Sequence, residues 1–60
     1  MAAFDLHAFV SDPTLAQLER CKKRHLCEIA RYYEISVSSA LTKAELEAVV
    51  LEGLIKQGIL

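Results

Sequence analysis

Residues 32–46, YYEISVSSALTKAEL, mark the point at which one helical pattern ends and another begins. Ile35 and Val37 are β-branched and two residues apart, so this stretch favours an extended backbone with both side chains on one side. Thr42 and Glu45 then form the capping-box pattern, in which each side chain accepts a hydrogen bond from the other residue's amide. The sequence therefore predicts two helices joined by an extended, serine-containing link.

Apolar residues on both sides of this link recur at helical spacing. Those before it are Leu26, Ile29, Ala30 and Tyr33. The helix after it is predicted to run from Thr42 to about Gln57, with Gly58 as a left-handed cap. Its apolar residues form two faces: Leu46, Val49, Val50 and Leu54 on one, and Ala44, Ala48, Leu51 and Ile55 on the other. Such a helix needs cover on both faces, from residues 22–33 and 4–18 or partly from a second copy of the chain.

Two helix start signals precede these two helices in the sequence. Asp5 predicts a short helix, and Asp12 followed by Pro13 predicts another that begins at the proline. Leu15 and Leu18 of this second helix are expected to face the core. A break is expected near Cys21, because one uninterrupted helix would be poorly covered by so short a chain. The sequence thus predicts a single all-α domain over residues 1–60, a three- to four-helix bundle in which an N-terminal helical segment, residues 1–20, joins a core of residues 21–60.

Composition limits the classes of function. The 60 residues are 53% hydrophobic and 25% charged, too apolar for intrinsic disorder and too interrupted for a membrane span. A chain of this length buries only about 60% of its unfolded surface, so a deep active-site cleft is not expected. We therefore expect neither an enzyme nor a small-molecule substrate. The start of the chain lacks the pattern of a secretory signal, which favours an intracellular location, nuclear or cytoplasmic.

The cysteines and histidines do not predict a metal site. Cys21 and Cys27 are six residues apart in a helical pattern, too far to form a disulfide, and are expected to be free thiols. Cys21 and His25 could share a helix face, but a zinc site needs further ligands at a spacing that this sequence lacks. We expect no metal and no cofactor, with Cys27 as a buried filler, Cys21 at the helix junction and His25 exposed.

Charge is unevenly distributed along the chain. The net charge is −1, yet residues 20–31 hold five basic residues and one acidic residue. Basic side chains at a helix start add to the positive potential of the backbone amides, which favours phosphate. If the two helix starts share one side, a phosphate-facing surface would comprise Lys22, Lys23, Arg24, Ser38, Ser39 and Lys43. The alternative interpretation is a solvated charged face.

Residues 22–54, KKRHLCEIARYYEISVSSALTKAELEAVVLEGL, resemble the SAP family and its helix-extension-helix relatives, in which a second helix introduced by Lys-x-x-Leu follows an extended link. The resemblance implies DNA or chromatin binding through the link and the two helix starts, which carries over to the six residues of that surface. Ala40 and Leu41 depart from the family, whose link usually has a glycine and more basic residues. The chain is also similar to N-terminal segments of retroelement-derived proteins in fish genomes.

A second hypothesis is of a different class. Relatives of the SAP family also serve as protein-interaction modules, and the second apolar face of the last helix would suit that role. In this interpretation the chain is an interaction or self-association domain of a larger protein. Its contact surface would include Leu51 and Ile55, or the segment 4–10 with Phe4 and Phe9.

Overall fold

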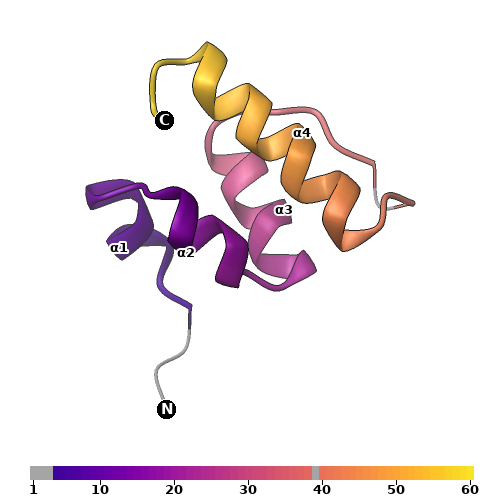
Figure 1. The fold of residues 1–60 in the computed structure, drawn as a ribbon, viewed down its shortest axis with the longest axis horizontal. Coiled ribbons are helices and arrows are strands. Elements are labelled where there is room, and N and C mark those ends of the chain that lie inside the picture. Colours follow the sequence, from indigo (N-terminus) through magenta and orange to yellow (C-terminus); the bar gives the residue numbers. More distant parts are fainter. Residues whose placement is uncertain (1–3, 39) are drawn as a thin grey trace.

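The computed structural model describes residues 4–38 and 40–60, and this part of the chain contains helices and no strand. The helices are α1 (Leu6–Ser11), α2 (Leu15–Arg20), α3 (Lys23–Tyr32) and α4 (Lys43–Lys56). In Figure 1, α3 and α4 lie side by side and run in the same general direction, and the link returns from the end of α3 to the start of α4. The prediction of a small all-α bundle with a helix, an extended link and a helix is confirmed.

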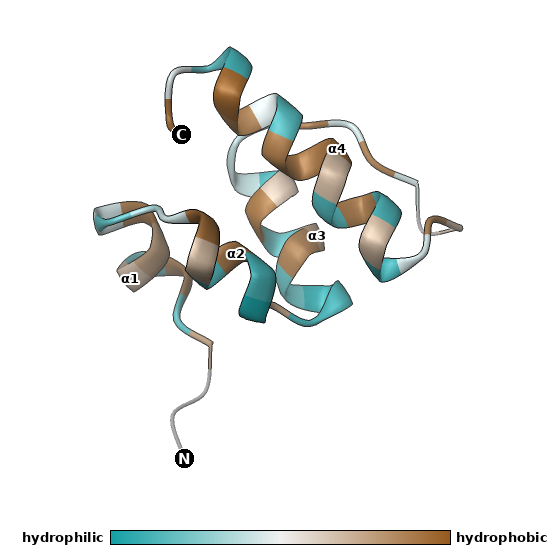
Figure 2. Cartoon of the chain, viewed as in Figure 1, coloured by the Kyte–Doolittle hydropathy of each residue, from teal (hydrophilic) through white to brown (hydrophobic). Residues whose placement is uncertain are grey.

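A single hydrophobic core joins the four helices. Its fully buried residues are Phe9 from α1, Leu18 from α2, Cys21 between helices, Leu26, Ile29 and Ala30 from α3, and Leu46, Val50 and Leu54 from α4. Figure 2 shows hydrophobic residues along the length of α4, whereas the end of α2 and the first turn of α3 are hydrophilic. The helical spacing of apolar residues thus predicts the buried face of α3 and one of the two apolar faces of α4. The expected cover of the other α4 face is not found within the described residues, since Ala44, Ala48 and Ile55 are exposed and Leu51 is half-buried.

Both ends of α4 form as the sequence predicts. The Glu45 amide donates to Thr42 Oγ1 over 3.2 Å, and the Thr42 amide donates to Glu45 Oε1 over 3.0 Å. At the other end, Gly58 adopts a φ of +79°. The amides of Gly58 and Ile59 then donate to the carbonyls of Ile55 and Leu54 over 3.0 and 2.8 Å, which is the pattern of a Schellman cap.

The predicted start of α2 is wrong by two residues. Asp12 closes α1 instead, since its amide donates to the Ala8 carbonyl over 3.2 Å. The N-cap of α2 is Thr14, whose Oγ1 accepts from the Gln17 amide over 3.2 Å. The Gln17 side chain also donates to the Asp12 carbonyl over 2.8 Å and fixes the connection between the helices. Asp5 caps α1 as predicted, by accepting from the His7 amide over 3.0 Å.

The helix break at Cys21 is confirmed, but the neighbouring burial differs from the prediction. Leu18 is fully buried, whereas Leu15 is 48% exposed and does not face the core. Because α2 has only six residues, it buries Leu18 and leaves its first residue, Leu15, exposed. The buried cysteine is Cys21, and Cys27 is only half-buried. His25 is partly covered, because its ring stacks on Phe4 with centroids 4.5 Å apart.

The link leaves α3 through Glu34, which has a φ of +58° although it is not a glycine. This left-handed residue lets the Ile35 amide donate back to the Ala30 carbonyl over 2.7 Å. Ile35 and Val37 then pack against the core from the same side of the link, as their alternation predicts. The chain therefore turns back from α3 without a glycine in the link.

Candidate nucleic-acid interface

The starts of α3 and α4 lie at one edge of the molecule. Lys43, the first residue of α4, donates from Nζ to the backbone carbonyl of Glu19 over 3.3 Å. Glu19 belongs to the last turn of α2, and α3 begins only four residues later, at Lys23. Figure 1 shows both helix starts at the same end of the α3–α4 pair. The common edge on which the predicted surface depends is therefore present.

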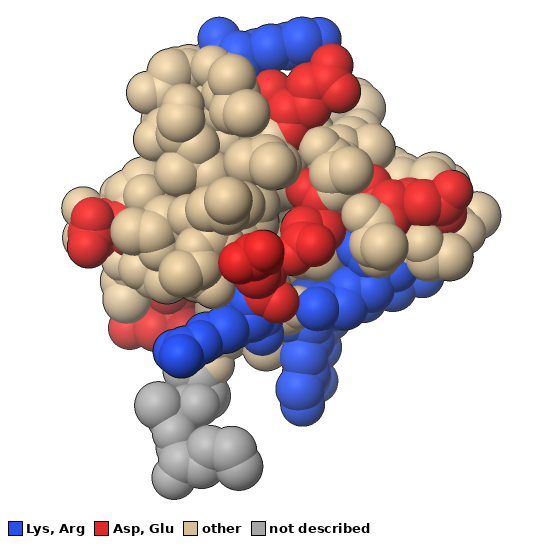
Figure 3. Space-filling view, in the orientation of Figure 1, with Lys and Arg blue, Asp and Glu red and all other residues tan. Residues whose placement is uncertain are grey.

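Five exposed basic residues surround these helix starts, and we call them the basic edge: Arg20, Lys22, Lys23, Arg24 and Lys43. Figure 3 shows lysine and arginine side chains gathered along one border of the molecule, below a group of carboxylates. The helices that adjoin the edge also carry exposed carboxylates, Glu19 on α2 and Glu45 on α4. The edge is thus positive at its outer border and mixed in charge behind it.

Glu45 stays ionised beside the basic edge. The backbone amide of Thr42 donates to its carboxylate, and this hydrogen bond, with a further contribution from the Thr42 side chain, lowers the pKa of Glu45 below its ordinary value. The carboxylate is therefore engaged in the helix cap. Its negative charge still weakens the potential that an anionic partner would meet at Lys43.

The start of α3 differs from that of α4 in its cap. Lys22 is the N-cap residue, and its side chain makes no capping hydrogen bond because lysine has no acceptor. Instead, the Lys22 backbone amide donates to Nδ1 of His25 over 3.3 Å. The positive end of the α3 dipole therefore lies among the cations of the basic edge without a carboxylate cap of its own.

Ser38 builds the turn that leads into α4. Its Oγ accepts from the Ala40 amide over 3.2 Å, and its carbonyl accepts from the Leu41 amide over 3.2 Å. The side chain is exposed, and its hydroxyl proton can still be donated. Ser39, the other predicted serine, lies outside the described residues.

Cys21 lies between Arg20 and Lys22 of the basic edge and is buried. Its Sγ donates to the Gln17 carbonyl over 3.3 Å, and both cysteines are free thiols, as predicted. Burial raises the pKa of the Cys21 thiol, an effect that the nearby charge of Lys43 opposes and that of Glu47 reinforces. Among the described residues, no group of three or more His, Cys, Asp and Glu side chains could hold a metal ion.

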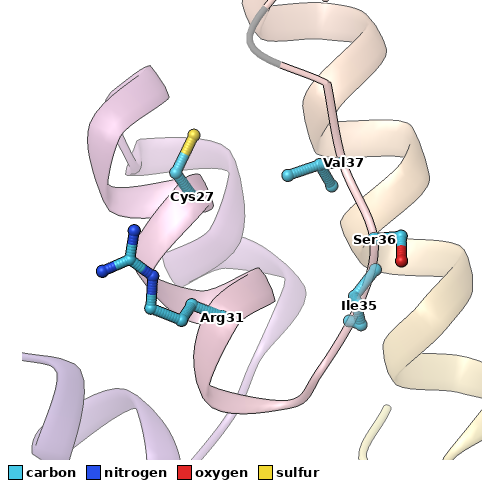
Figure 4. A pocket seen from close by; sticks show the side chains of 5 residues that line it. All are labelled: Cys27, Arg31, Ile35, Ser36 and Val37. Atoms are coloured by element: carbon cyan, nitrogen blue, oxygen red, sulfur yellow. The ribbon is translucent and has the colours of Figure 1, made fainter.

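A groove of about 360 Å³ runs between α3 and the link, away from the predicted surface. Its lining residues are Cys27, Arg31, Ile35, Ser36 and Val37. Figure 4 shows the Val37 side chain pointing toward α3 and that of Arg31 pointing away from the link. None of the five described residues among those predicted to bind nucleic acid lines it.

The residues of the second hypothesis differ in accessibility. Phe9 is fully buried, which removes it from any contact surface of the folded chain, and Phe4 is committed to its stack on His25. Ile55 is 55% exposed and Leu51 is half-buried. Tyr32, the last residue of α3, is also 55% exposed. It lies about 14 Å along the helix from the basic residues at the start of α3, so it does not belong to the basic edge.

Sequence reasoning did not identify two contributors to this edge. The Glu19 carbonyl that positions Lys43 is 24 residues away in sequence, and no local signal marks such a contact. Glu47 lies close enough to Cys21 to raise its pKa, and its Oε1 is buried with no hydrogen-bond partner among the described residues. Only the spacing of Glu47 from Lys43, one helical turn along α4, could have indicated its place near the edge.

Comparison with protein-family models, curated proteins and solved structures finds no match for this chain. The resemblance to the SAP family therefore stays a prediction based on the residues quoted above. In the described part of the chain, the helices are too short or too polar for any of them to cross a membrane.

Proposed function

We propose that the chain is a nucleic-acid-binding module that contacts backbone phosphates through the basic edge. The observation that carries the proposal is the contact between Lys43 Nζ and the Glu19 carbonyl, because the start of α4 lies beside the junction of α2 and α3 at this point. Cations from three segments of the chain are thereby gathered around two helix starts. A phosphate at this edge would meet ammonium and guanidinium groups together with the positive ends of two helix dipoles.

The same arrangement favours weak binding without sequence preference. Flexible lysine and arginine side chains neutralise phosphates and release counterions, which gives affinity that falls steeply with salt. Reading of base sequence would need an element that enters a groove and presents side chains to base edges. The helices of the basic edge present their starts rather than their sides, and Glu19 and Glu45 limit how closely a polyanion can approach. Contacts to phosphate are therefore the main source of affinity.

A comparison of two charge-matched variants tests the proposal. Lys22→Ala/Arg24→Ala removes two charges from the basic edge, and Arg31→Ala/Lys56→Ala removes two charges from the far ends of α3 and α4. Binding to a fluorescent DNA duplex would be measured by anisotropy between about 50 and about 200 mM salt. We expect the first variant to bind at least ~10-fold more weakly at low salt and to lose about 0.9 from the salt slope per lost contact. The second variant should keep most of the affinity.

Two results would contradict this function. One is the absence of detectable binding by the intact chain at the lowest salt concentration. The other is an equal loss of affinity in the two double variants, which would mean that DNA responds only to net charge and that the basic edge has no special role. Circular dichroism of each variant would check that the helices remain folded.

A further inference from the structure

A hollow of about 260 Å³ lies between the start of α1 and the second half of α3. Its lining residues are Leu6, Glu28, Arg31 and Tyr32, and we call it the tyrosine hollow. Sites for drug-sized molecules usually have volumes of about 300–1,000 Å³, so this hollow suits a single planar ring system rather than a whole cofactor. None of the residues of the basic edge lines it.

Tyr32 places an exposed aromatic ring at this hollow. The residue is 55% exposed. Its ring meets that of Tyr33 edge to face, with centroids 4.9 Å apart, and Tyr33 in turn packs against the core. The ring of Tyr32 is thus held at the surface without being covered. Proteins that bind single strands of nucleic acid use aromatic rings as platforms on which the bases stack, beside cations that contact the phosphates.

The two charged residues of the hollow suit a nucleobase better than a phosphate. Glu28 and Arg31 carry opposite charges, and neither side chain has an ion-pair or hydrogen-bond partner among the described residues. A phosphate in the hollow would be repelled by the Glu28 carboxylate. A base is neutral and planar, and its edge carries both hydrogen-bond donors for a carboxylate and acceptors for a guanidinium. The hollow therefore fits a base, while the phosphates of the same strand lie outside it.

Arg31 connects the hollow to the basic edge. Arg24 and Arg31 are seven residues apart, which places them on one face of α3 and about 10 Å apart along its axis. Figure 4 shows the Arg31 side chain pointing away from the link. A strand whose phosphates lie at the start of α3 thus reaches Arg31 and Tyr32 within a few nucleotides.

We propose that this module takes its nucleic acid as a single strand, with phosphates on the basic edge and one base stacked on Tyr32 in the tyrosine hollow. The inference rests on the proposed function, because it assigns a further contact to the same ligand. A base of a single strand can turn outward and stack on an aromatic side chain, whereas the bases of a duplex are already stacked and paired. Stacking tolerates every base, so it adds affinity without sequence preference.

Fluorescence anisotropy at one low salt concentration tests this contact with a DNA strand of about ten nucleotides and with the duplex of the same sequence. Tyr32→Ala is expected to weaken binding of the strand at least ~5-fold and to leave binding of the duplex unchanged. Tyr32→Phe keeps the ring and should keep most of the affinity. An RNA strand of the same sequence should show the same loss, because the stack uses the base and not the sugar.

Ile55→Ala is the matched control, since Ile55 is 55% exposed like Tyr32 but belongs to the last turn of α4. It should leave the binding of strand and duplex unchanged, and circular dichroism would verify that each variant stays folded. If Tyr32→Ala does not change single-strand binding, or weakens duplex binding equally, the stack on Tyr32 is overturned while the basic edge keeps its role. If neither strand nor duplex binds the intact chain, the proposed function fails together with this inference.

Discussion

Gly53 allows the link to pack directly on α4. A Cβ atom at this position would lie 2.7 Å from Ile35 Cδ1 and 2.8 Å from Ile35 Cγ1, well inside ordinary van der Waals contact. Ile35 is one of the side chains that close the core from the link. A glycine within a helix is usually unfavourable because of its backbone freedom. Here that loss is offset by the close approach of a large aliphatic side chain.

Gly53→Ala is therefore expected to lower the free energy of unfolding by about 1–2 kcal/mol, since the overlap with Ile35 outweighs the better helix propensity of alanine. Urea denaturation of the single variants and of Ile35→Ala/Gly53→Ala would measure this. The overlap is absent in the double variant, so Gly53→Ala should cost much less in the Ile35→Ala background. A Gly53→Ala protein more stable than the original would contradict this prediction, because it would mean that Ile35 moves aside at little cost.

Glu45 links the stability of α4 to pH. Its folded-state pKa is lowered from 4.5, first by the hydrogen bond from the Thr42 amide. A lowered pKa means that its carboxylate stabilises the fold above the unfolded-state value, and that this contribution is lost as pH falls through the folded-state value. Glu45→Gln should therefore be less stable than the original chain at about pH 7, with the difference closing below about pH 4. Thermal unfolding across this range checks the prediction, and a difference that does not change with pH would refute it.

At the scale of the elements, the chain leaves α3 through a left-handed residue that is not a glycine. Glu34 adopts a left-handed φ of +58°, which costs a non-glycine residue about 1 kcal/mol. Glu34→Gly should raise the free energy of unfolding by about 0.5–1 kcal/mol, because glycine adopts this conformation without that cost. Glu28→Gly, at an exposed position inside α3, should lower it by about 1 kcal/mol. Chemical denaturation measures the free energy of unfolding of both variants. If both variants gain stability, or both lose it, the role given to Glu34 would be contradicted.

The start of α2 gives a second prediction about an element. Thr14 caps the helix through its hydroxyl, whereas Asp12 contributes its backbone amide and carbonyl to the connection. Thr14→Ala is expected to lower the free energy of unfolding by about 1 kcal/mol, and Asp12→Ala should change it by less than about 0.5 kcal/mol. Denaturation curves measured side by side would test this. A larger loss of stability in Asp12→Ala than in Thr14→Ala would contradict this assignment and indicate that Asp12 caps α2.

Local signals allowed most of the helices to be predicted. The capping box at Thr42, the glycine cap at position 58 and the apolar spacing of α3 each depend on residues within a turn or two of one another. The start of α2 was predicted two residues too early, because Asp12 and Thr14 are both acceptable caps. The choice between them depends on α1 continuing to Ser11 and using Asp12 to end. The exposure of Leu15 likewise depends on how short α2 is.

Only the charge of the candidate site could be predicted from the sequence. The cluster at Lys22 and Arg24 is evident from the sequence, whereas its proximity to Lys43 depends on tertiary packing across 24 residues. The neighbouring carboxylates reduce the local excess of positive charge, and their positions also follow from the packing. Sequence reasoning therefore proposed the candidate residues, and the structure adds the geometry that brings the described ones to one edge.

At the scale of the whole molecule, positive charge gathers around the starts of α3 and α4, where the basic edge lies. The far end of α4 carries Lys56, whose charge is paired with Glu52 over 3.3 Å. A polyanion is therefore expected to approach the molecule from the side of the two helix starts.

An NMR titration of the isotope-labelled chain with a short DNA duplex at low salt tests the central claim most directly. We expect the backbone amide signals of Lys22, Arg24 and Lys43, and of the turn at Ser38, to shift progressively with added duplex. Those of Ile55 and Lys56, at the far end of α4, should stay nearly unchanged. Shifts concentrated at that far end, or no shifts at all, would contradict the assignment of the basic edge as a nucleic-acid-binding surface.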